Sequence, residues 1–258
     1  MASGRDGAQS VHRVALLLRV LAAQGRDGCR LLDLAAASGL ERPTVHRLLK
    51  GLMAEGMVAQ GPAGRRYRLG HLVFELGLAA APRFDLRRLC EPALTRLAER
   101  TGDTVFLSVR SGNDSVCLDR KEGSFPIKTL TVDVGTRRPL GVGAGGLALL
   151  TSLPAAEAEA VLAVNARQFA GYADLDPPIL REMLARAQIL GYVLNDRQVT
   201  PGAMSLALPV NDAYGRPLAA ISIGAIASRM APARQHELAA LLRAEVAELE
   251  RQLARPPT

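Results

Sequence analysis

The chain has 258 residues, enough for two domains that each bury a core, and its formal net charge is +7. It contains no Trp and only 3% aromatic residues, which argues against a protein that binds RNA or single strands by base stacking. No run reaches the roughly 18 apolar residues of a membrane-spanning helix, and the first ten residues lack the apolar segment of a signal peptide. We therefore expect an intracellular, cytoplasmic protein with no membrane partner.

The excess positive charge lies almost entirely near the N-terminus. Residues 1–70 contain 11 Lys or Arg against 5 Asp or Glu, whereas residues 71–258 contain 21 against 20. A basic segment attached to a near-neutral remainder is typical of a nucleic-acid-binding module joined to a domain with another purpose.

The stretch 31–57 has the pattern of a helix-turn-helix. Apolar residues at helical spacing predict a first helix, which Gly39 ends because glycine tolerates the left-handed backbone of a sharp turn. A second helix is expected to begin near Arg42, with Pro43 in its first turn, where a missing N–H costs nothing. Its buried apolar face is expected to comprise Val45, Leu48, Leu49 and Leu52.

The opposite face of this second helix is basic and rich in hydrogen-bonding groups. Such a face suits the major groove of double-stranded DNA, whose floor carries acceptors and whose walls are phosphates. The alternative is a helical hairpin whose charged face is merely solvated. The residues predicted to contact DNA from this helix are Arg42, Pro43, Thr44, His46, Arg47 and Lys50.

A short β-hairpin is expected directly after the helix-turn-helix. Two β-prone runs, 57–59 and 65–69, flank a segment rich in Gly and Pro that marks a reversal of the chain. A basic hairpin in this place is typical of the wing of a winged helix, which rests on the DNA backbone or minor groove, and it favours DNA binding over the inert hairpin. The wing residues predicted to contact DNA are Arg65, Arg66 and Arg68.

Two further helices are expected around this unit. Ser10 is predicted to cap a helix that closes the core of the DNA-binding unit. The helical stretch 69–80 is apolar over more than one face, which a small domain cannot cover alone. Pairing with its copy in a second subunit would bury this surface, so we expect a linker helix that supports a symmetric dimer.

From residue 85 the pattern becomes that of an α+β domain, in which an antiparallel sheet carries helices on its faces. Asp85 is expected to cap the first helix. A loop over 135–146 is expected to lead into the next helix. Strands are predicted over 104–110, 115–119, 125–134, 192–195, 204–210 and 218–225. The other helices are predicted over 86–101, 147–150, 155–165, 177–190 and 233–253.

The glycine-rich segment 141–146 formally matches the dinucleotide fingerprint G-x-G-x-x-G. Its context does not fit, because Arg137-Arg138-Pro139 stands where a buried parallel strand should end. Two interpretations of these glycines stay open. They allow a helix to pack closely, or they leave free N–H groups at a helix start that attract a carboxylate.

Several separated motifs resemble, in the same order, the IclR family of bacterial transcriptional regulators over nearly the full length. They are Gly39-Leu40 with Thr44 to Leu49, Tyr67-Arg68-Leu69-Gly70, Leu118-Asp119-Arg120 with Glu122-Gly123, Arg138-Pro139-Leu140 with Ala144-Gly145-Gly146, and Gly191-Tyr192. The resemblance implies a winged helix-turn-helix domain over 1–69, ordered from about residue 10, a linker helix over 70–83 and a GAF-like effector-binding domain with an antiparallel sheet over 84–258. It also implies a homodimer or a dimer of dimers.

The resemblance further implies a pocket for a small-molecule effector, which we expect to be anionic. Small residues and hydroxyls leave room for a ligand and offer donors. Arg138 stands where some relatives have an apolar residue, and it either pairs with an anionic effector or is an exposed loop arginine. Gly224 stands where some relatives have a hydroxyl. The pocket residues carried over are Arg138, Ala144, Gly145, Asn195, Ser205, Ser222 and Gly224.

An enzyme acting on a small molecule and an architectural DNA-binding protein without a ligand are the alternatives. Three of the four histidines lie in the DNA-binding half or its linker, and the chain lacks a G-x-S-x-G elbow, a metal-spaced His pair and a P-loop. The three cysteines are far apart and lack metal-ligand spacing, so we expect reduced thiols, no metal and no cofactor. We predict a sequence-specific DNA-binding regulator, with repression as the expected mode, and no catalytic activity.

Overall fold

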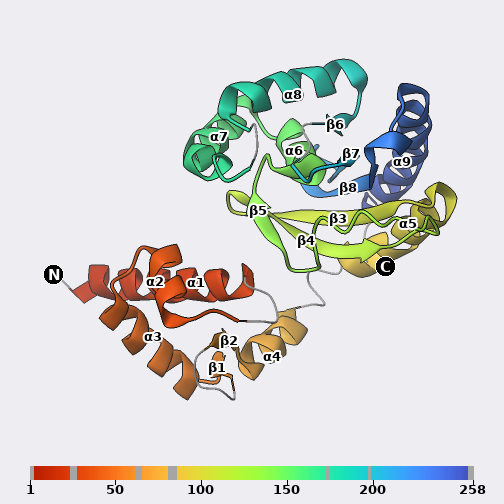
Figure 1. The fold of residues 1–258 in the computed structure, drawn as a ribbon. Coiled ribbons are helices and arrows are strands. Elements are labelled where there is room, and N and C mark those ends of the chain that lie inside the picture. The colour runs from red at the N-terminus through yellow and green to blue at the C-terminus, as the bar shows by residue number, and fades with distance from the viewer. Residues whose placement is uncertain are drawn as a thin grey trace. The chain divides into compact units, whose positions relative to one another are not determined.

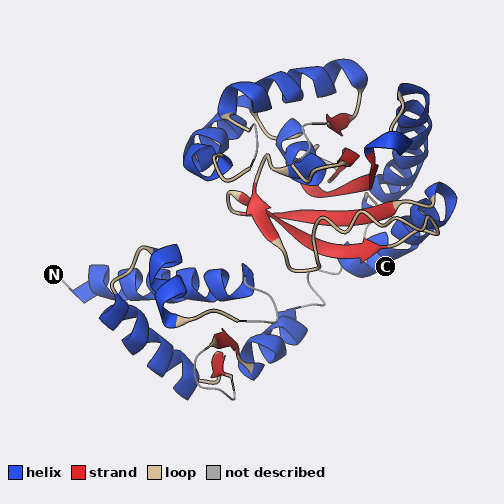
Figure 2. Cartoon of the chain, viewed as in Figure 1, coloured by secondary structure: helices blue, strands red, loops and turns tan. Residues whose placement is uncertain are grey.

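The computed structural model divides into two compact units, residues 1–85 and 86–258 (Figure 1). It describes residues 3–23, 28–61, 66–80, 86–172, 175–196 and 199–254. Both units contain helices and strands, as Figure 2 shows. No helix in these described ranges is long and apolar enough to cross a membrane.

The N-terminal unit is a helical domain followed by a hairpin, which confirms the predicted winged helix-turn-helix. Its elements are α1 (Ser3–Ala23), α2 (Leu31–Ser38), α3 (Arg42–Ala54), β1 (Val58–Gln60), β2 (Tyr67–Leu69) and α4 (His71–Ala80). Gly39 ends α2 with a φ of 65°, the left-handed conformation that the sharp turn requires. The core of the unit contains Leu17, Leu21, Cys29, Leu34, Val45, Leu49, Leu52, Val58 and Tyr67.

The prediction that Ser10 caps the first helix is wrong. Helix α1 begins at Ser3, so Ser10 lies inside it. No proline interrupts the preceding residues, and a serine inside a helix costs too little to end it. The second predicted cap, Asp85, lies outside the described residues.

The hairpin is antiparallel and gains a third segment from the residues that precede α2. Val58 pairs with Leu69 and Gln60 pairs with Tyr67. On its other edge, Tyr67 exchanges two backbone hydrogen bonds of 2.8 Å with Cys29. These bonds attach β2 of the wing to the segment that leads into α2.

The C-terminal unit contains a six-stranded antiparallel sheet in the order β5-β4-β3-β8-β7-β6. The strands are β3 (Thr104–Ser111), β4 (Asp114–Lys121), β5 (Arg137–Pro139), β6 (Val193–Asn195), β7 (Ala203–Asn211) and β8 (Pro217–Ile226). The helices are α5 (Leu86–Thr101), α6 (Gly143–Thr151), α7 (Ala155–Phe169), α8 (Pro177–Leu190) and α9 (Pro232–Leu253), with the short 3-10 helix η3 (Ala227–Arg229) before α9. The predicted α+β architecture is confirmed.

The two faces of the sheet carry separate helix layers (Figure 1). Alternate residues of β8 show the division, because Ile221 and Ile223 pack in the core formed with α5 and α9. Ala220 instead packs in the second core, which α6, α7 and α8 provide. On that second side, Ser222 and Gly224 border a cavity.

Two expectations for residues 125–146 are wrong. Residues 125–134 form no strand, because the outer edge of β4 is taken by 135–139: Asp114 pairs with Pro139, and Cys117 exchanges backbone bonds with residues 135 and 136. Helix α6 begins at Gly143 rather than near residue 147. The apolar stretch that follows is buried, so tertiary packing overrides the low helix propensity of the glycines.

Candidate functional site

Helix α3 presents an exposed basic face on the N-terminal unit. Val45, Leu49 and Leu52 are buried against the core, as the spacing predicts, and the fourth predicted residue, Leu48, is half-buried and packs against them. Of the residues predicted to contact DNA from this helix, Thr44 is half-buried, and the exposed ones are Arg42, Pro43, His46, Arg47 and Lys50. The geometry therefore leaves this face open to a partner, although contact with DNA stays a prediction.

No carboxylate in the described part of the chain neutralises the cations of α3. Among the described residues, Arg42, Arg47 and Lys50 form no ion pair with a carboxylate. Unpaired positive charges on an exposed helix create a potential that favours phosphate groups.

The wing arginines differ from one another. Arg68 is exposed on β2, opposite Ala59. Arg66 is also exposed, but its Nη1 donates a 2.9 Å hydrogen bond to the carbonyl oxygen of Gly28. Arg66 therefore contributes to the attachment of the wing, a role that the sequence did not reveal. Arg65 lies outside the described residues.

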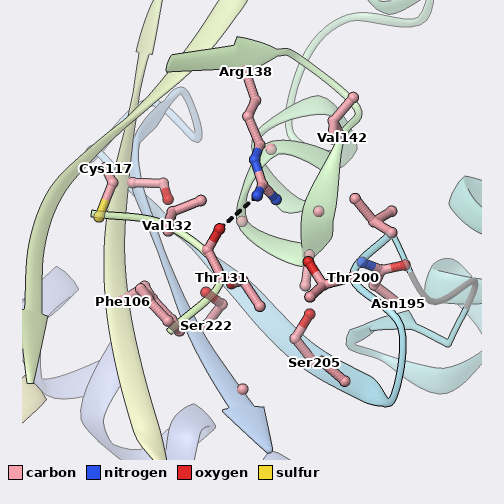
Figure 3. A pocket seen from close by; sticks show the side chains of 18 of the residues that line it. Phe106, Cys117, Thr131, Val132, Arg138, Val142, Asn195, Thr200, Ser205 and Ser222 are labelled. Atoms are coloured by element: carbon pink, nitrogen blue, oxygen red, sulfur yellow. Dashed lines mark hydrogen bonds between the residues drawn. The ribbon is translucent and has the colours of Figure 1, made fainter. Parts of the chain in front are cut away.

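The C-terminal unit has a cavity on the side of the sheet that carries α6 (Figure 3). The empty space in the cavity and its open mouth together is about 640 Å³. The structure brings together in its wall all the residues that the resemblance implied, namely Arg138, Ala144, Gly145, Asn195, Ser205, Ser222 and Gly224. Their contact with an effector stays a prediction.

The start of α6 forms one end of this cavity. Residues 143–146 line it, and the preceding Val142 gives the helix no side-chain cap. The N–H groups of a first helical turn have no partner within the helix, and the helix dipole adds positive potential there. Gly143 has a φ of 76°, which favours glycine at this position. The arrangement suits an anion.

Close packing also explains two of the glycines. A Cβ atom on Gly145 would lie 2.8 Å from Oγ of Ser108, and one on Gly146 would lie 3.1 Å from Oγ of Ser115. The absence of side chains lets α6 approach β3 and β4. Both interpretations of the glycine segment therefore have structural support, and a larger residue at 145 would disturb packing as well as the cavity.

Arg138 on β5 faces the cavity rather than solvent (Figure 3). Its Nη2 donates a 2.6 Å hydrogen bond to the carbonyl oxygen of Thr131, and its Nη1 lies 3.9 Å from where a Cβ of Gly143 would be. Burial lowers the pKa of its guanidinium, with Tyr172 and Cys117 acting in the opposite direction. Within the part of the chain that the structure describes, Arg138 has no carboxylate partner. It is a half-buried cation beside an uncapped helix start.

Sequence reasoning missed much of the polar wall. Ser108 and Ser115 come from β3 and β4, and Thr129 and Thr131 come from the segment between β4 and β5. Ser108, which interrupts the apolar run of β3 between Leu107 and Val109, was the available sign. Cys117 also lines the cavity, and burial raises the pKa of its thiol to about 11. All three cysteines are buried free thiols.

Two family models match this chain. One is described as the IclR helix-turn-helix domain and matches residues 10–62. The other is described as the bacterial transcriptional regulator IclR C-terminal domain and matches residues 78–251.

Similar proteins cover most of the chain. The HTH-type transcriptional regulator XynR of Escherichia coli (strain K12) is 30% identical over 223 residues, which is 86% of this chain and 88% of XynR. The HTH-type transcriptional repressor AllR of Salmonella typhi is 32% identical over 231 residues, which is 88% of this chain and 84% of AllR.

Solved structures share the fold. An ICLR transcriptional regulator from Silicibacter sp. TM1040 has a TM-score of 0.81 at 27% identity and covers 96% of this chain and 100% of its own. An IclR homolog from Microbacterium hydrocarbonoxydans, complexed with 4-hydroxybenzoate, has a TM-score of 0.71 at 24% identity and covers 95% of this chain and 98% of its own.

Proposed function

The chain belongs to the IclR family of DNA-binding transcriptional regulators, and we propose that it represses transcription as a dimer whose affinity for operator DNA changes when a small organic anion binds in the C-terminal cavity. Repression is supported by the relatives that are named repressors. A regulator of this kind acts on the chromosome, so we place it in the cytoplasm. We propose no catalytic role.

DNA binding is assigned to the exposed face of α3 and to the wing. The face carries Arg42, Arg47 and Lys50 without carboxylate partners among the described residues, while the opposite face is fixed in the core. One helix reads only a few base pairs, so specificity requires two recognition helices on a two-fold related site.

The dimer is supported by α4. Phe74, Leu76 and Leu78 are 60%, 50% and 58% exposed in the monomer. Apolar surface of this kind gains about 25 cal/mol for each Å² removed from water, so pairing with a second α4 is favourable. Two such dimers can associate further, as the resemblance implies.

The single observation that carries the effector proposal is Arg138. This half-buried arginine has no carboxylate partner among the described residues and lies beside the uncapped start of α6, so an anionic ligand would match it. The 4-hydroxybenzoate bound to the structural relative is an organic anion, which supports this class of ligand.

The test is a reciprocal titration. Fluorescence anisotropy would measure affinity for a DNA duplex selected from a random pool, with and without a panel of small carboxylates, and thermal shift would report their binding. We expect a carboxylate that raises Tm to change DNA affinity, and DNA to change the carboxylate's affinity by the same factor. A carboxylate that binds the wild type without affecting DNA binding would contradict its role as effector.

Matched variants locate the site. Arg138→Gln should weaken the active carboxylate about tenfold or more, because it removes a charge-assisted contact, and should leave DNA affinity without ligand unchanged. Arg181→Gln is the control, since Arg181 is paired with Glu159 on the surface, away from the cavity wall. Equal behaviour of the two variants would place the anion elsewhere.

A further inference from the structure

The cavity wall offers more hydrogen-bonding groups than a carboxylate alone can use. Eight of the lining side chains are serine or threonine, and Asn195 adds an amide. Figure 3 shows Asn195, Thr200 and Ser205 grouped on one wall, away from Arg138 on β5. Asn195 and Ser205 are register partners on β6 and β7, so the sheet itself fixes their proximity. The polar groups therefore lie on at least two walls of the site.

Two of these groups are buried and lack partners within the part of the chain that the structure describes. Asn195 and Thr129 are each 7% exposed. Oδ1 of Asn195 and Oγ1 of Thr129 form no hydrogen bond with any described residue. A buried polar atom without a partner is unfavourable, and Oδ1 can only accept. A ligand that brings hydroxyl groups would satisfy both atoms, because a hydroxyl donates and accepts.

The charges of the wall restrict the ligand further. Arg138 is the single charged side chain among the described lining residues, and none of them is a carboxylate. One carboxylate matches this cation, whereas a second would be desolvated without a partner. Phe106 is the single aromatic side chain in the same set. A flat apolar ring would strip water from the serine and threonine hydroxyls without replacing their hydrogen bonds.

We propose that the ligand is an aliphatic monocarboxylate that carries several hydroxyl groups. Its carboxylate lies at Arg138 and the start of α6, and its hydroxyls bond Asn195, Ser205 and Thr129. This assignment rests on the proposed function, since it names the class of anion that the cavity takes. It makes Asn195 and Thr129 the residues that select for hydroxyl groups.

A matched panel tests the class on the full-length protein by calorimetry and thermal shift. The hydroxylated acids are glycerate, threonate and gluconate. Propanoate, butanoate and hexanoate lack the hydroxyls, glucitol lacks the carboxylate, galactarate adds a second carboxylate, and benzoate supplies a ring. We expect at least one hydroxylated acid to bind about tenfold or more tightly than its unsubstituted counterpart, glucitol and galactarate, as expected for two or more hydrogen bonds. Equal or tighter binding of hexanoate, galactarate or benzoate, or no binding of any hydroxylated acid, overturns the proposal.

Variants of Asn195 and Thr129 show whether these side chains select for hydroxyl groups on the ligand or only support the fold. Asn195→Leu and Thr129→Val preserve size and remove the polar atoms, so each should weaken the hydroxylated acid roughly two- to tenfold. Neither should weaken an unsubstituted acid of the same length. Thr95→Val is the control, because the Thr95 hydroxyl bonds the Glu91 carbonyl oxygen on α5, outside the cavity wall. Equal losses for both kinds of acid would show a merely structural role and overturn the assignment.

The Arg138→Gln variant distinguishes failure of the hydroxyl assignment from failure of the proposed effector function. If hexanoate or benzoate binds the wild type, alters DNA affinity and loses binding in Arg138→Gln, the effector function stands and the hydroxyl assignment alone is wrong. If no anion binds and the variant behaves like the wild type, the effector function fails and the assignment falls with it.

Discussion

Many arginine side chains of the C-terminal unit are paired with carboxylates, whereas those on the outer face of α3 have no such partner among the described residues. Arg96 lies 2.7 Å from Glu245, Arg110 lies 2.6 Å from Glu157, and further pairs follow the same pattern. Within the described part of the N-terminal unit, the one carboxylate pair joins His71 to Glu75. The two units thus have different electrostatic designs.

Paired charges contribute to the fold, whereas exposed unpaired charges are available to a binding partner. A paired arginine is neutralised where it stands, while an exposed unpaired one contributes potential toward an anionic surface. Arg138 is informative because it lies in the C-terminal unit but, like the arginines on the outer face of α3, has no carboxylate partner among the described residues. Unpaired positive charge therefore lies at both proposed sites, the DNA-binding face and the effector cavity.

The largest effect should come from breaking the most buried pairing. Asp103 is 4% exposed and accepts from Arg229 Nε at 2.9 Å and Arg234 Nη2 at 2.8 Å. Asp103→Asn leaves two arginines without their counter-ion and should lower the free energy of unfolding by about 3–5 kcal/mol. Urea denaturation measures this, with the exposed variant Glu159→Gln as control. If both variants unfold at the same urea concentration, the cluster does not stabilise the unit.

The next effect concerns the unpaired cations. Arg47→Ala and Lys50→Ala should each weaken operator binding by about 1–3 kcal/mol if they contact bases, and stability should be unchanged. Arg181→Ala removes the same charge from a paired site and should leave DNA affinity as it was. Anisotropy titrations at fixed salt decide the matter. Similar losses for Arg47→Ala and Arg181→Ala would mean that total charge, rather than the face of α3, governs binding.

A smaller effect is expected at the wing, where variants of Arg68 and Arg66 should behave differently. Arg68→Ala should lower the slope of log affinity against log salt by about one unit, the change expected for one lost phosphate contact. Arg66→Ala should also lower stability by about 1 kcal/mol, because its bond to the Gly28 carbonyl is lost. Salt titrations and thermal melts of both variants measure the two effects. An unchanged slope for both would remove the wing from the DNA interface.

The smallest expected effect is that of the Arg138 charge on the reactivity of Cys117, which lines the same cavity. Burial raises the pKa of Cys117 to about 11, while Arg120 and Arg138 act to lower it. The folded state thus favours the neutral thiol, a contribution present below the unfolded pKa and lost as pH rises through about 11. Peptide mapping after iodoacetamide treatment should show slower alkylation of Cys117 in Arg138→Gln between pH 9 and 11. Faster alkylation would show that Arg138 limits access instead.

The sequence predicted what short-range pattern controls. Gly39, the apolar spacing of α3 and the glycine-rich reversal were enough to define the winged helix, and the ends of α8 were predicted correctly. The failure at 125–134 has a non-local cause, because two segments compete for the edge of β4 and local β propensity does not reveal the winner.

Of the residues that line the cavity, only those implied by the family resemblance were predicted. The register of β3 against β4 shifts between Leu107 and Ser108, so simple alternation does not tell which face Ser108 joins. Thr129 enters the wall from an irregular segment, where no period applies. The bond from Arg66 to Gly28 likewise joins residues far apart in the chain.

The cavity wall draws on residues from Phe106 to Gly224, so the site exists only when the whole sheet has formed. An effector that binds there binds the folded chain and not the unfolded one. It therefore lowers the population of unfolded molecules. Cellular proteases degrade chains in proportion to that open population when opening is fast. The half-life of this regulator in the cell should therefore lengthen when its effector is abundant, which adjusts the number of regulator molecules as well as their activity.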